Sequence, residues 1–540
     1  MMKKAIKKLL AALLAVAMLC AMAIPAFAGT EGDITTWHSF SAFQIFKGDV
    51  EGNDIKDFKI SNVTWGSNIA DNPAAFLDQL KADSTLGTQF QFIDATDANT
   101  AQKVLEVISK WDDSDANSIA FARVVCHYLY PDANATPEPA VKGGGGSDHI
   151  HFDEAGYYLV VDTTPFNPGD FDHAYNSFLL MVTKGNWNVP ITPKAEKPSV
   201  KKEVFDNFDN QDGTSTGVFG SSADHAINEK FQFKLTATLP ASTDHAYDYY
   251  DTYAVCFKDT LSEGITYDKL DSVVINSNGH TYDITNDTSK YTITESQNSF
   301  VVKIPDVKTC AEGLDLNDGA TITVTYIAHL NEKAFVNTEG GSTSNINKVY
   351  LTYSNNPRDE SSIGKTPEST PVYVYTYQLS NTKHQDTKDG LALEGACFRL
   401  YSDEACTDQS EVQLYQKDGF YYPIKDVLGK EAVEMKSAAN GTFNVKGLDA
   451  GTYYLKEITP PDGYSACKVI PVTIKADHSR NDQVNLEGSN LTNDIVNIKA
   501  GGITLPSTGG IGTTLFYVVG GGLMVAAIVL LVTKKRMENK

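Results

Sequence analysis

The sequence predicts a mainly β protein in which three β-sandwich domains follow one another, the first of them with helical insertions. Three observations support this fold class. Apolar and polar residues alternate in several segments, as they do in half-buried antiparallel strands. Two linker-like stretches, Pro193–Ser199 and Thr366–Pro371, interrupt this pattern. The residues between the two chain ends suffice for about three domains of ordinary size.

These linkers and the two chain ends set the expected divisions. They are a signal peptide (1–28), an N-terminal α+β domain (29–194), a middle β-sandwich (195–371), a C-terminal β-sandwich (372–500) and a C-terminal tail (501–540).

The first 28 residues have the composition of a secretory signal peptide. Four early lysines precede an apolar stretch, Leu9–Ile24, and Ala26-Phe27-Ala28 forms a small-x-small cleavage site. The alternative, a permanent membrane anchor, does not explain this cleavage site. We therefore expect the mature chain to begin near Gly29, outside the cell.

The N-terminal domain differs from the other two because part of it has helical rather than alternating periodicity. Val104, Leu105 and Ile108 have the spacing of one helix face. The expected helices cover 74–83, 99–112 and 115–130, inserted into a strand framework.

The middle domain has the clearest strand patterns. In Glu229–Leu239 every second residue from Phe231 on is apolar, and the residues between them are Gln, Lys or Thr. The segment Ile322–Leu330 repeats this alternation. Each pattern predicts a strand with one buried face and one solvated face.

The C-terminal tail combines three features in a fixed order. Leu505-Pro506-Ser507-Thr508-Gly509 precedes an apolar run, Ile511–Val532, long enough to span a bilayer, and a basic cluster follows at 534–536. This combination resembles the cell-wall sorting signal of sortase substrates in Gram-positive bacteria. The resemblance implies cleavage between Thr508 and Gly509 and transfer of the Thr508 carboxyl to an amine, with sortase and peptidoglycan as partners. The alternative is a permanent membrane anchor with a chance motif.

Composition excludes several classes of function. The formal net charge is −23, and it becomes more negative when the basic chain ends are removed, which argues against nucleic-acid binding. The six cysteines outside the signal peptide lack Cys-x-x-Cys spacing, so they predict neither a zinc site nor a disulfide-stapled fold. Only Cys397 and Cys406 are placed to bridge a hairpin, and we do not predict that they do.

Three segments of the C-terminal domain carry a further resemblance: Tyr375–Lys383, Leu393–Tyr401 and Tyr453–Tyr464. They resemble a CnaB-type pilin domain of Ig-like fold, and the last is similar to its E-box. The overall plan resembles SpaA/FimA-type major pilins, over nearly the whole chain and most weakly over residues 30–150. This resemblance implies a fimbrial backbone subunit and intramolecular isopeptide bonds, in which a Lys amine displaces the side-chain amide of an Asn.

Such a bond requires a neutral amine and a protonated acid, and burial in an apolar core favours both. In the C-terminal domain Lys383, Asn497 and the acid Glu457 have inward strand parity. The resemblance implies that Lys383 and Asn497 form the cross-link and that Glu457 promotes it.

The middle domain offers a second set by the same criterion. Lys202 alternates with Val200 and Val204, Asn347 with Val349, and Asp259 with Phe257. We expect a Lys202–Asn347 cross-link promoted by Asp259. Lys201 and Asn345 are the nearest competitors. The bonds would join the first and last strands of their domains.

The N-terminal domain is expected to lack such a bond. When its Tyr157–Leu159 segment is aligned with the E-box, Val161 takes the place of the acid. Asp162 is one residue away and therefore on the opposite strand face.

A backbone pilin also needs an acceptor lysine for the Thr508 carboxyl of the next subunit. Trp187–Lys194 resembles the pilin motif, with Lys194 as the acceptor. The Trp-to-Lys spacing is shorter than the family's and Thr192 replaces its Tyr, so Lys197 stays open as an alternative.

Two other functions compete with a polymerised pilin. One is a non-polymerised or tip adhesin attached directly to the cell wall. The other is a wall-anchored enzyme, but the sequence has no nucleophile elbow, His-Glu-x-x-His or phosphate-binding loop. His149, His151 and Asp153 are more typical of polar surface than of a metal site. We expect no enzyme, cofactor or metal, and as partners identical subunits, with ancillary pilins and host surface receptors as further possibilities.

Overall fold

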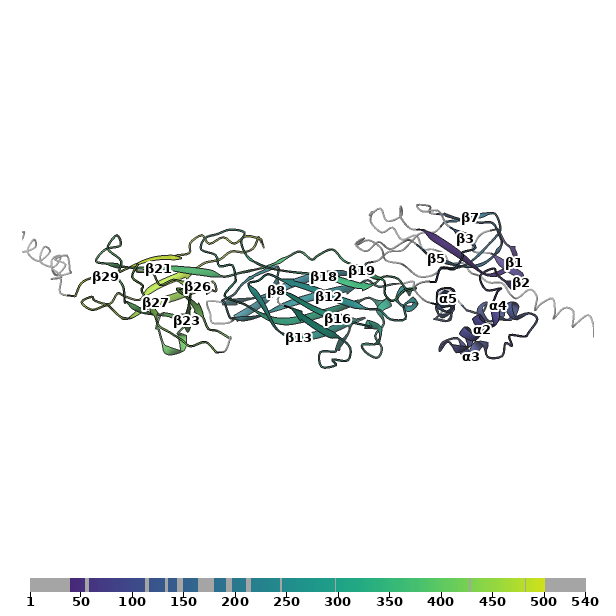
Figure 1. Ribbon diagram of the computed structural model, residues 1–540, viewed down its shortest axis with the longest axis horizontal. Helices are drawn as coiled ribbons and strands as arrows, with labels where there is room; N and C mark the ends of the chain where they lie inside the picture. Colours follow the sequence, from purple (N-terminus) through teal and green to yellow (C-terminus); the bar gives the residue numbers. More distant parts are fainter. Residues whose placement is uncertain are drawn as a thin grey trace, which may run out of the picture. The chain divides into compact units, whose positions relative to one another are not determined.

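The fold is described from a computed structural model, shown in Figure 1. It describes residues 39–53, 58–111, 116–131, 135–142, 149–163, 179–190, 197–209, 215–242, 245–296, 298–426, 429–480 and 482–500. The predicted signal peptide, Lys194, the Leu505–Gly509 motif and the apolar run after it lie outside these ranges. Within the ranges, no helix has the length and apolar character needed to cross a bilayer.

The N-terminal region has a five-stranded sheet of order β2-β1-β5-β6, with β3 also paired to β1. A separate two-stranded sheet joins β4 and β7. The bounds are β1 Phe40–Glu51, β2 Lys59–Trp65, β3 Val141–Lys142, β4 His149–Phe152, β5 Gly156–Asp162, β6 Leu179–Thr183 and β7 Trp187–Pro190.

In the described part of this region, four helices follow β2 in the chain: α2 Pro73–Ala82, α3 Gly87–Phe90, α4 Thr100–Ile108 and α5 Ala116–Leu129. Three of them confirm the predicted helical insertions, and the short α3 was not predicted. Helix α2 begins after Asn72, whose side chain accepts a hydrogen bond from the Ala75 amide, with Pro73 in the first turn.

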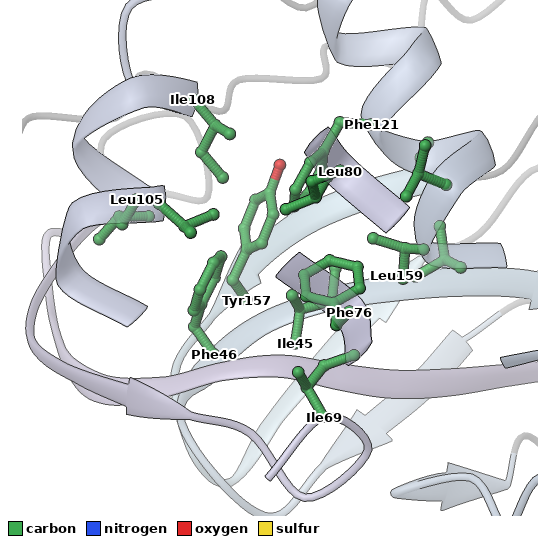
Figure 2. Close-up of a cluster of buried hydrophobic side chains, with 14 of the residues drawn as sticks. Ile45, Phe46, Ile69, Phe76, Leu80, Leu105, Ile108, Phe121, Tyr157 and Leu159 are labelled. Carbon is green, nitrogen blue, oxygen red and sulfur yellow. The ribbon is translucent and has the colours of Figure 1, made fainter. Parts of the chain in front are cut away.

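Strand β5 is buried along its whole length because both of its faces are covered. Figure 2 shows Tyr157 and Leu159 of β5 among helical side chains such as Phe76 and Phe121. On the other face Tyr158 packs in the cluster that contains Phe152 of β4. A strand buried on both faces reads as a continuous apolar run rather than an alternating one, as this one does.

The middle region has two sheets, of six and seven strands. The first has the order β14-β13-β17-β11-β8-β9, and the second β10-β20-β18-β12-β16-β15, with β19 paired to β18. The bounds are β8 Ser199–Asp209, β9 Ser215–Gly220, β10 Ser222–Asp224, β11 Lys230–Leu239, β12 Val255–Leu261, β13 Ile265–Ser277, β14 His280–Asp283, β15 Thr292–Ser296, β16 Ser299–Ile304, β17 Ala320–Leu330, β18 Asn345–Ser354, β19 Ile363–Lys365 and β20 Val372–Tyr375. Short 3₁₀ turns cover η2 Ala246–Tyr249, η3 Val307–Thr309 and η4 Leu316–Asp318.

The two middle sheets face each other across an aromatic core. The rings of Phe300 on β16 and Tyr326 on β17 lie 4.9 Å apart. Strands β11 and β17 pair in antiparallel register over their full length, and their apolar residues are the buried ones. The alternation predicted for both segments is confirmed.

The C-terminal region has a five-stranded sheet, β23-β24-β26-β21-β29, and a four-stranded sheet, β25-β22-β27-β28. The bounds are β21 Tyr377–Gln385, β22 Cys397–Tyr401, β23 Leu414–Lys417, β24 Phe420–Pro423, β25 Met435–Lys436, β26 Val445–Leu448, β27 Gly451–Thr459, β28 Ile470–Ile474 and β29 Thr492–Asn497, with a 3₁₀ turn η5 Asp408–Ser410. Strands β21 and β29 are adjacent and parallel.

The described residues form two compact units: those up to residue 376 together with 476–486, and residues 377–475 together with those from 487 on. One predicted boundary differs from this division. Strand β20 starts at Val372, where we expected the C-terminal domain to begin, but it pairs with β10 and β18 of the middle region. We predicted the domain boundary at the Pro-rich linker, whereas the seven-stranded sheet of the middle region continues past that linker. The remaining domain boundaries stay predictions.

Candidate isopeptide sites

The middle region brings the three predicted residues together between its two sheets. Lys202 comes from β8 of the six-stranded sheet, and Asp259 and Asn347 come from β12 and β18 of the seven-stranded sheet. The side chains of Lys202 and Asp259 have no exposed surface, and Asn347 is fully buried. Inward parity on three strands therefore converges on one point in the core.

A fourth residue, Tyr326 on β17, lies at the centre of this group. The Lys202 Nζ contacts Asp259 Oδ2 directly and donates to the Tyr326 hydroxyl at 3.2 Å. The hydroxyl donates to Asp259 Oδ2 at 3.0 Å and accepts from Asn347 Nδ2 at 2.6 Å. Tyr326 thus touches the amine, the acid and the amide at once.

Sequence reasoning missed Tyr326 although a signal for it was present. Tyr326 stands on the inward face of β17, between the buried apolar side chains of Val324 and Ala328. A hydroxyl in such a row needs a buried polar partner. The row itself does not say which partner the hydroxyl meets, since that residue comes from another strand.

Two acceptor atoms at this site lack hydrogen-bond partners: Asp259 Oδ1 and Asn347 Oδ1. A buried acceptor without a donor destabilises the fold, so each calls for an explanation. Protonation of Asp259 would turn one carboxyl oxygen from an acceptor into a donor. A proton on Asp259 would thus add the hydrogen-bond donor that these two oxygens lack, as expected if the acid works in its protonated form.

Burial shifts both ionisable groups toward their neutral forms. Loss of solvent lowers the pKa of Lys202 to about 8, against the opposing attraction of Asp259. The same loss of solvent raises the pKa of Asp259, although Lys202 and Tyr326 oppose the shift. A proton passing from the amine to the acid leaves a neutral nucleophile beside a protonated carboxyl.

The two competing residues occupy different environments. The Lys201 side chain is 70% exposed and pairs with Glu203. Asn345 is buried, but both of its side-chain polar atoms bond to the backbone, at Phe335 and Val374. Lys201 is on the outer face, and Asn345 has a structural role, which leaves Lys202 and Asn347 as the candidate pair.

The C-terminal region assembles its set differently. Lys383 and Asn497 lie on the neighbouring parallel strands β21 and β29, and Glu457 comes from β27 of the facing sheet. Lys383 Nζ donates to Asn497 Oδ1 at 2.6 Å, and Asn497 Nδ2 donates to Glu457 Oε1 at 2.7 Å. The amine lies 3.6 Å from the same Glu457 oxygen. All three residues meet without an intermediary.

The surroundings of Lys383 also favour a neutral amine. Its side chain is fully buried and lies 5.2 Å from the centre of the Phe398 ring. Burial lowers the pKa of Lys383, with Cys467 and Glu457 opposing the shift. The backbone amide of Cys467 donates to Glu457 Oε2 at 2.7 Å and so fixes the orientation of the acid. Cys467 was not predicted as part of this site.

The N-terminal region has no comparable set among its described residues. Val161 is buried in the cluster covered by the helices, as the E-box alignment suggests. Lys47, on the neighbouring strand β1, forms an exposed ion pair with Glu154. His151 bonds to Asn188 on the exposed surface, as expected of polar surface residues.

The other predicted positions divide into two groups. Lys194 and the sorting motif Leu505–Gly509 lie outside the described residues, while Lys197 is described and partly buried. All six cysteines that the structure describes are free thiols, so Cys397 and Cys406 form no bridge.

Comparison with protein families gives two matches, one to the predicted C-terminal domain and one to the predicted sorting signal. Residues 379–489 match the model described as SpaA, prealbumin-like fold domain. Residues 497–539 match the LPXTG cell wall anchor motif. The predicted sorting signal and the pilin-type C-terminal domain are confirmed.

Comparison with curated proteins and with solved structures gives further similarities. The chain is 25% identical over 444 residues to the trypsin-resistant surface T6 protein of Streptococcus pyogenes, covering 70% of this chain and 77% of that one. The structure of the T6 backbone pilin of S. pyogenes is similar with a TM-score of 0.46 and 18% identity, over 86% of this chain and 97% of that one. The full-length major pilin RrgB of Streptococcus pneumoniae gives a TM-score of 0.39 and 15% identity, over 68% and 88%.

Proposed function

We propose that this cell-wall-anchored pilin of a Gram-positive bacterium is the structural backbone subunit of a sortase-assembled pilus, closed by one self-formed Lys–Asn isopeptide bond in each of its two C-terminal domains. The observation that carries the proposal is the pair of buried Lys, acid and Asn sets, at Lys202 and at Lys383. A buried ion pair contributes little net stability by itself, so two such sets in one chain suggest chemistry.

The reaction balances without a cofactor. The neutral Nζ attacks the amide carbon Cγ, a new C–N bond forms, and the bond from Cγ to Nδ2 breaks. One proton moves from the amine to the leaving nitrogen, which departs as ammonia. The protonated acid gives a proton to the leaving nitrogen and takes one from the attacking amine, so it ends the reaction unchanged.

In the C-terminal domain one oxygen can perform both transfers. Glu457 Oε1 lies 3.6 Å from the Lys383 amine and 2.7 Å from Asn497 Nδ2. It faces both the group that loses a proton and the group that gains one. The Cys467 amide holds the other carboxyl oxygen in place.

In the middle domain the transfer runs through two residues. Asp259 contacts the Lys202 amine, and the Tyr326 hydroxyl connects Asp259 to Asn347 Nδ2. A proton taken up by Asp259 can pass to the hydroxyl oxygen while the hydroxyl proton passes to the leaving nitrogen. Tyr326 would then be regenerated with each transfer.

The proposed bonds suit a subunit that transmits tension. The C-terminal bond would join β21 and β29, the first and last strands of that domain. The middle bond would join β8 to β18 across the sandwich, although β19 and β20 follow β18 in the chain. A pulling force would then pass through covalent bonds instead of through the hydrogen-bonded sheets.

Polymerisation requires one acceptor amine, for which we propose Lys194 in the pilin-like motif, with Lys197 as the alternative. The donor would be Thr508 of the next subunit, activated by sortase. The last subunit would be transferred to peptidoglycan by the same chemistry. Support comes from the matched anchor motif and from the similarity to the T6 protein.

Two measurements test the proposal. Intact-mass analysis of residues 29–508 should show the loss of two ammonia molecules, and a full unmodified mass would refute both bonds. Immunoblots of boiled cell-wall extracts should show a high-mass ladder that collapses to monomer in Lys194→Ala. A ladder in the Lys194→Ala strain would move the linkage to another lysine such as Lys197, and a single band in wild type would indicate a non-polymerised adhesin.

A further inference from the structure

A second cluster of ionisable side chains lies in the larger unit, apart from the isopeptide sites. Asp206 is on β8 and Asp224 on β10, and both are buried, with 2% and 7% of their surface exposed. His478 joins them from the segment 476–486, which belongs to the same compact unit. Three residues far apart in the sequence thus place ligand atoms within 4.8 Å of one another.

Independent contacts hold the segment 476–486 in place. Gly341 and Val484 exchange two backbone hydrogen bonds, of 3.0 and 2.9 Å. Asp477 and Asn485 pair in the same way within the segment. His478 is therefore presented by a fixed backbone and does not depend on the acids for its position.

The hydrogen bonds of Ser222 determine the tautomer of His478. The Ser222 hydroxyl donates its one proton to the His478 carbonyl oxygen at 3.0 Å. Its contact of 2.9 Å with His478 Nδ1 must then be one in which Nδ1–H donates and Ser222 Oγ accepts. In the neutral imidazole, Nε2 consequently carries no hydrogen and presents a lone pair.

This lone pair faces the two carboxyl groups. Nε2 lies 3.5 Å from Asp206 Oδ2 and 3.9 Å from Asp224 Oδ1. In the part of the chain that the structure describes, no hydrogen bond reaches Nε2 or Asp206 Oδ2, and 97% of the Asp206 side chain is buried. Nε2 and Asp206 Oδ2 therefore face each other in a buried place without a hydrogen bond, which is unfavourable unless a cation joins them.

The distances favour a metal ion over a proton as the cation that would join these atoms. A charge-assisted hydrogen bond from a protonated Nε2 would be about 2.7–2.9 Å long. Ligands bonded at about 2.1 Å in a tetrahedral site lie about 3.4 Å apart, which the 3.5 Å separation matches and the 3.9 Å separation exceeds. The Nδ1 bond to Ser222 is also the outer-shell contact that orients a metal-binding His.

The charges agree with this geometry. His225 is buried nearby, but its Nε2 bonds to the Phe205 carbonyl oxygen. Two clustered carboxyl groups thus share a buried site with two imidazoles, and a divalent cation would neutralise both acids.

We propose that Asp206, Asp224 and His478 form a site for a divalent transition-metal ion such as Zn²⁺, with water completing the coordination. One imidazole and two carboxylates suit Zn²⁺ or Mn²⁺ better than Ca²⁺, which prefers oxygen ligands alone. The ion would fasten the segment 476–486 to β8 and β10. This site does not depend on the isopeptide bonds.

The test is calorimetric titration of tag-free residues 29–508, treated with chelator, with Zn²⁺, Mn²⁺ and Ca²⁺ in turn. We expect one Zn²⁺ per chain, no comparable Ca²⁺ binding, and a Tm that rises with Zn²⁺. Asp206→Asn and His478→Gln should each weaken binding by about tenfold or more, and Ser222→Ala by a smaller factor. The control is His329→Gln, which removes a His that contacts a single acid, Asp268, at 2.8 Å.

Three results would overturn the site. Wild type that binds no Zn²⁺ would exclude it, and so would equal binding by wild type and His478→Gln. A third result would be titrations without heat of binding, together with a lower Tm for His478→Gln only in mildly acidic buffer. It would show that a proton, not a metal, joins the three residues. Because Ser222→Ala removes no ligand, it keeps the test valid if either ligand variant fails to fold.

Discussion

The middle and C-terminal domains hold the same three functional groups in different arrangements. In the C-terminal domain the Glu457 carboxylate reaches the Asn497 amide directly, at 2.7 Å. In the middle domain the acid is Asp259, whose side chain is one methylene shorter, and the Tyr326 hydroxyl stands between it and the Asn347 amide. The comparison suggests that the reach of the acid and the presence of a bridging hydroxyl compensate for each other.

The domains also differ in which strands the Lys and Asn occupy. Lys383 and Asn497 are on adjacent strands of one sheet, whereas Lys202 and Asn347 belong to opposite sheets. The first pair can meet through strand register alone. The second pair needs the packing of the whole sandwich, so its bond should form only after the core has closed.

The largest expected effect comes from removing an acid. Glu457→Ala should abolish the C-terminal bond and leave the middle bond intact, because the two sites share no residue. Intact mass should rise by one ammonia relative to wild type, after allowance for the substitution. The lost cross-link closes a loop of more than 100 residues, which corresponds to a loss on the order of 4 kcal/mol in the free energy of unfolding.

Glu434→Ala is the matched control for this loss, because Glu434 is an exposed acid of the same domain that pairs with Arg399. Its mass should show both ammonia losses. Retention of the C-terminal bond in Glu457→Ala would contradict the role of that acid.

Tyr326→Phe should slow bond formation in the middle domain and leave bond formation in the C-terminal domain unchanged. It removes only the hydroxyl, so we expect the middle bond to form at least about tenfold more slowly while the C-terminal bond forms normally. The measurement is the time course of ammonia loss after refolding, resolved by peptide mapping of each cross-link.

Tyr267→Phe is the control for Tyr326→Phe. The Tyr267 ring packs 5.7 Å from that of Tyr326, but Tyr267 makes no contact with the Lys, acid or amide that the structure records. Normal kinetics in Tyr326→Phe would show that Asp259 suffices and that the hydroxyl only fills space.

A pH effect is expected when the middle site is kept unreacted by Asn347→Ala. The folded chain has a Lys202 pKa of about 8, against 10.5 for an unperturbed lysine. Between these values the unfolded chain binds a proton that the folded chain does not, so the free energy of unfolding should rise with pH. Urea titrations across this window measure the slope.

The double variant Asn347→Ala with Lys202→Met is the control for this slope, because it removes the titrating amine. It should lose that rise with pH. A flat profile in the single variant would mean that Lys202 titrates like an exposed lysine.

The smallest effect is predicted for Cys467→Ser. The contact with Glu457 comes from the backbone amide of residue 467, which serine keeps. Mass analysis should therefore show both ammonia losses, and the rate of C-terminal bond formation should change by less than about threefold. Failure of the C-terminal bond in this variant would indicate that the thiol itself takes part.

Strand parity predicted most of both candidate isopeptide sets, because each residue stands in the inward row of its strand. Parity could not separate Asn345 from Asn347, which are two positions apart on the same strand face. Their hydrogen bonds distinguish them, because backbone groups of Phe335 and Val374 occupy the polar atoms of Asn345, whereas the Asn347 amide bonds to Tyr326. Tyr326 and His478 escaped prediction because their partners are brought together by sheet topology and by the segment 476–486, and local sequence carries neither.

The helical insertions and the sandwich strands were predictable from their periodicity. The exceptions have physical causes as well. Helix α3 is one turn long, too short for a periodic signal. Strand β20 follows a Pro-rich stretch that is typical of linkers, yet its hydrogen bonds complete the middle sheet.

The neighbouring positions of Lys383 and Asn497 have a consequence for damage tolerance. If the two side chains are bonded, the chain from 384 to 496 becomes a closed loop, attached at two adjacent points to the part of the chain that transmits tension. A protease that cuts once within this loop, for example at the exposed turn around Gly419, would open the loop without dividing the subunit. A fibre of such subunits would keep its covalent continuity through cleavages that would sever an ordinary chain.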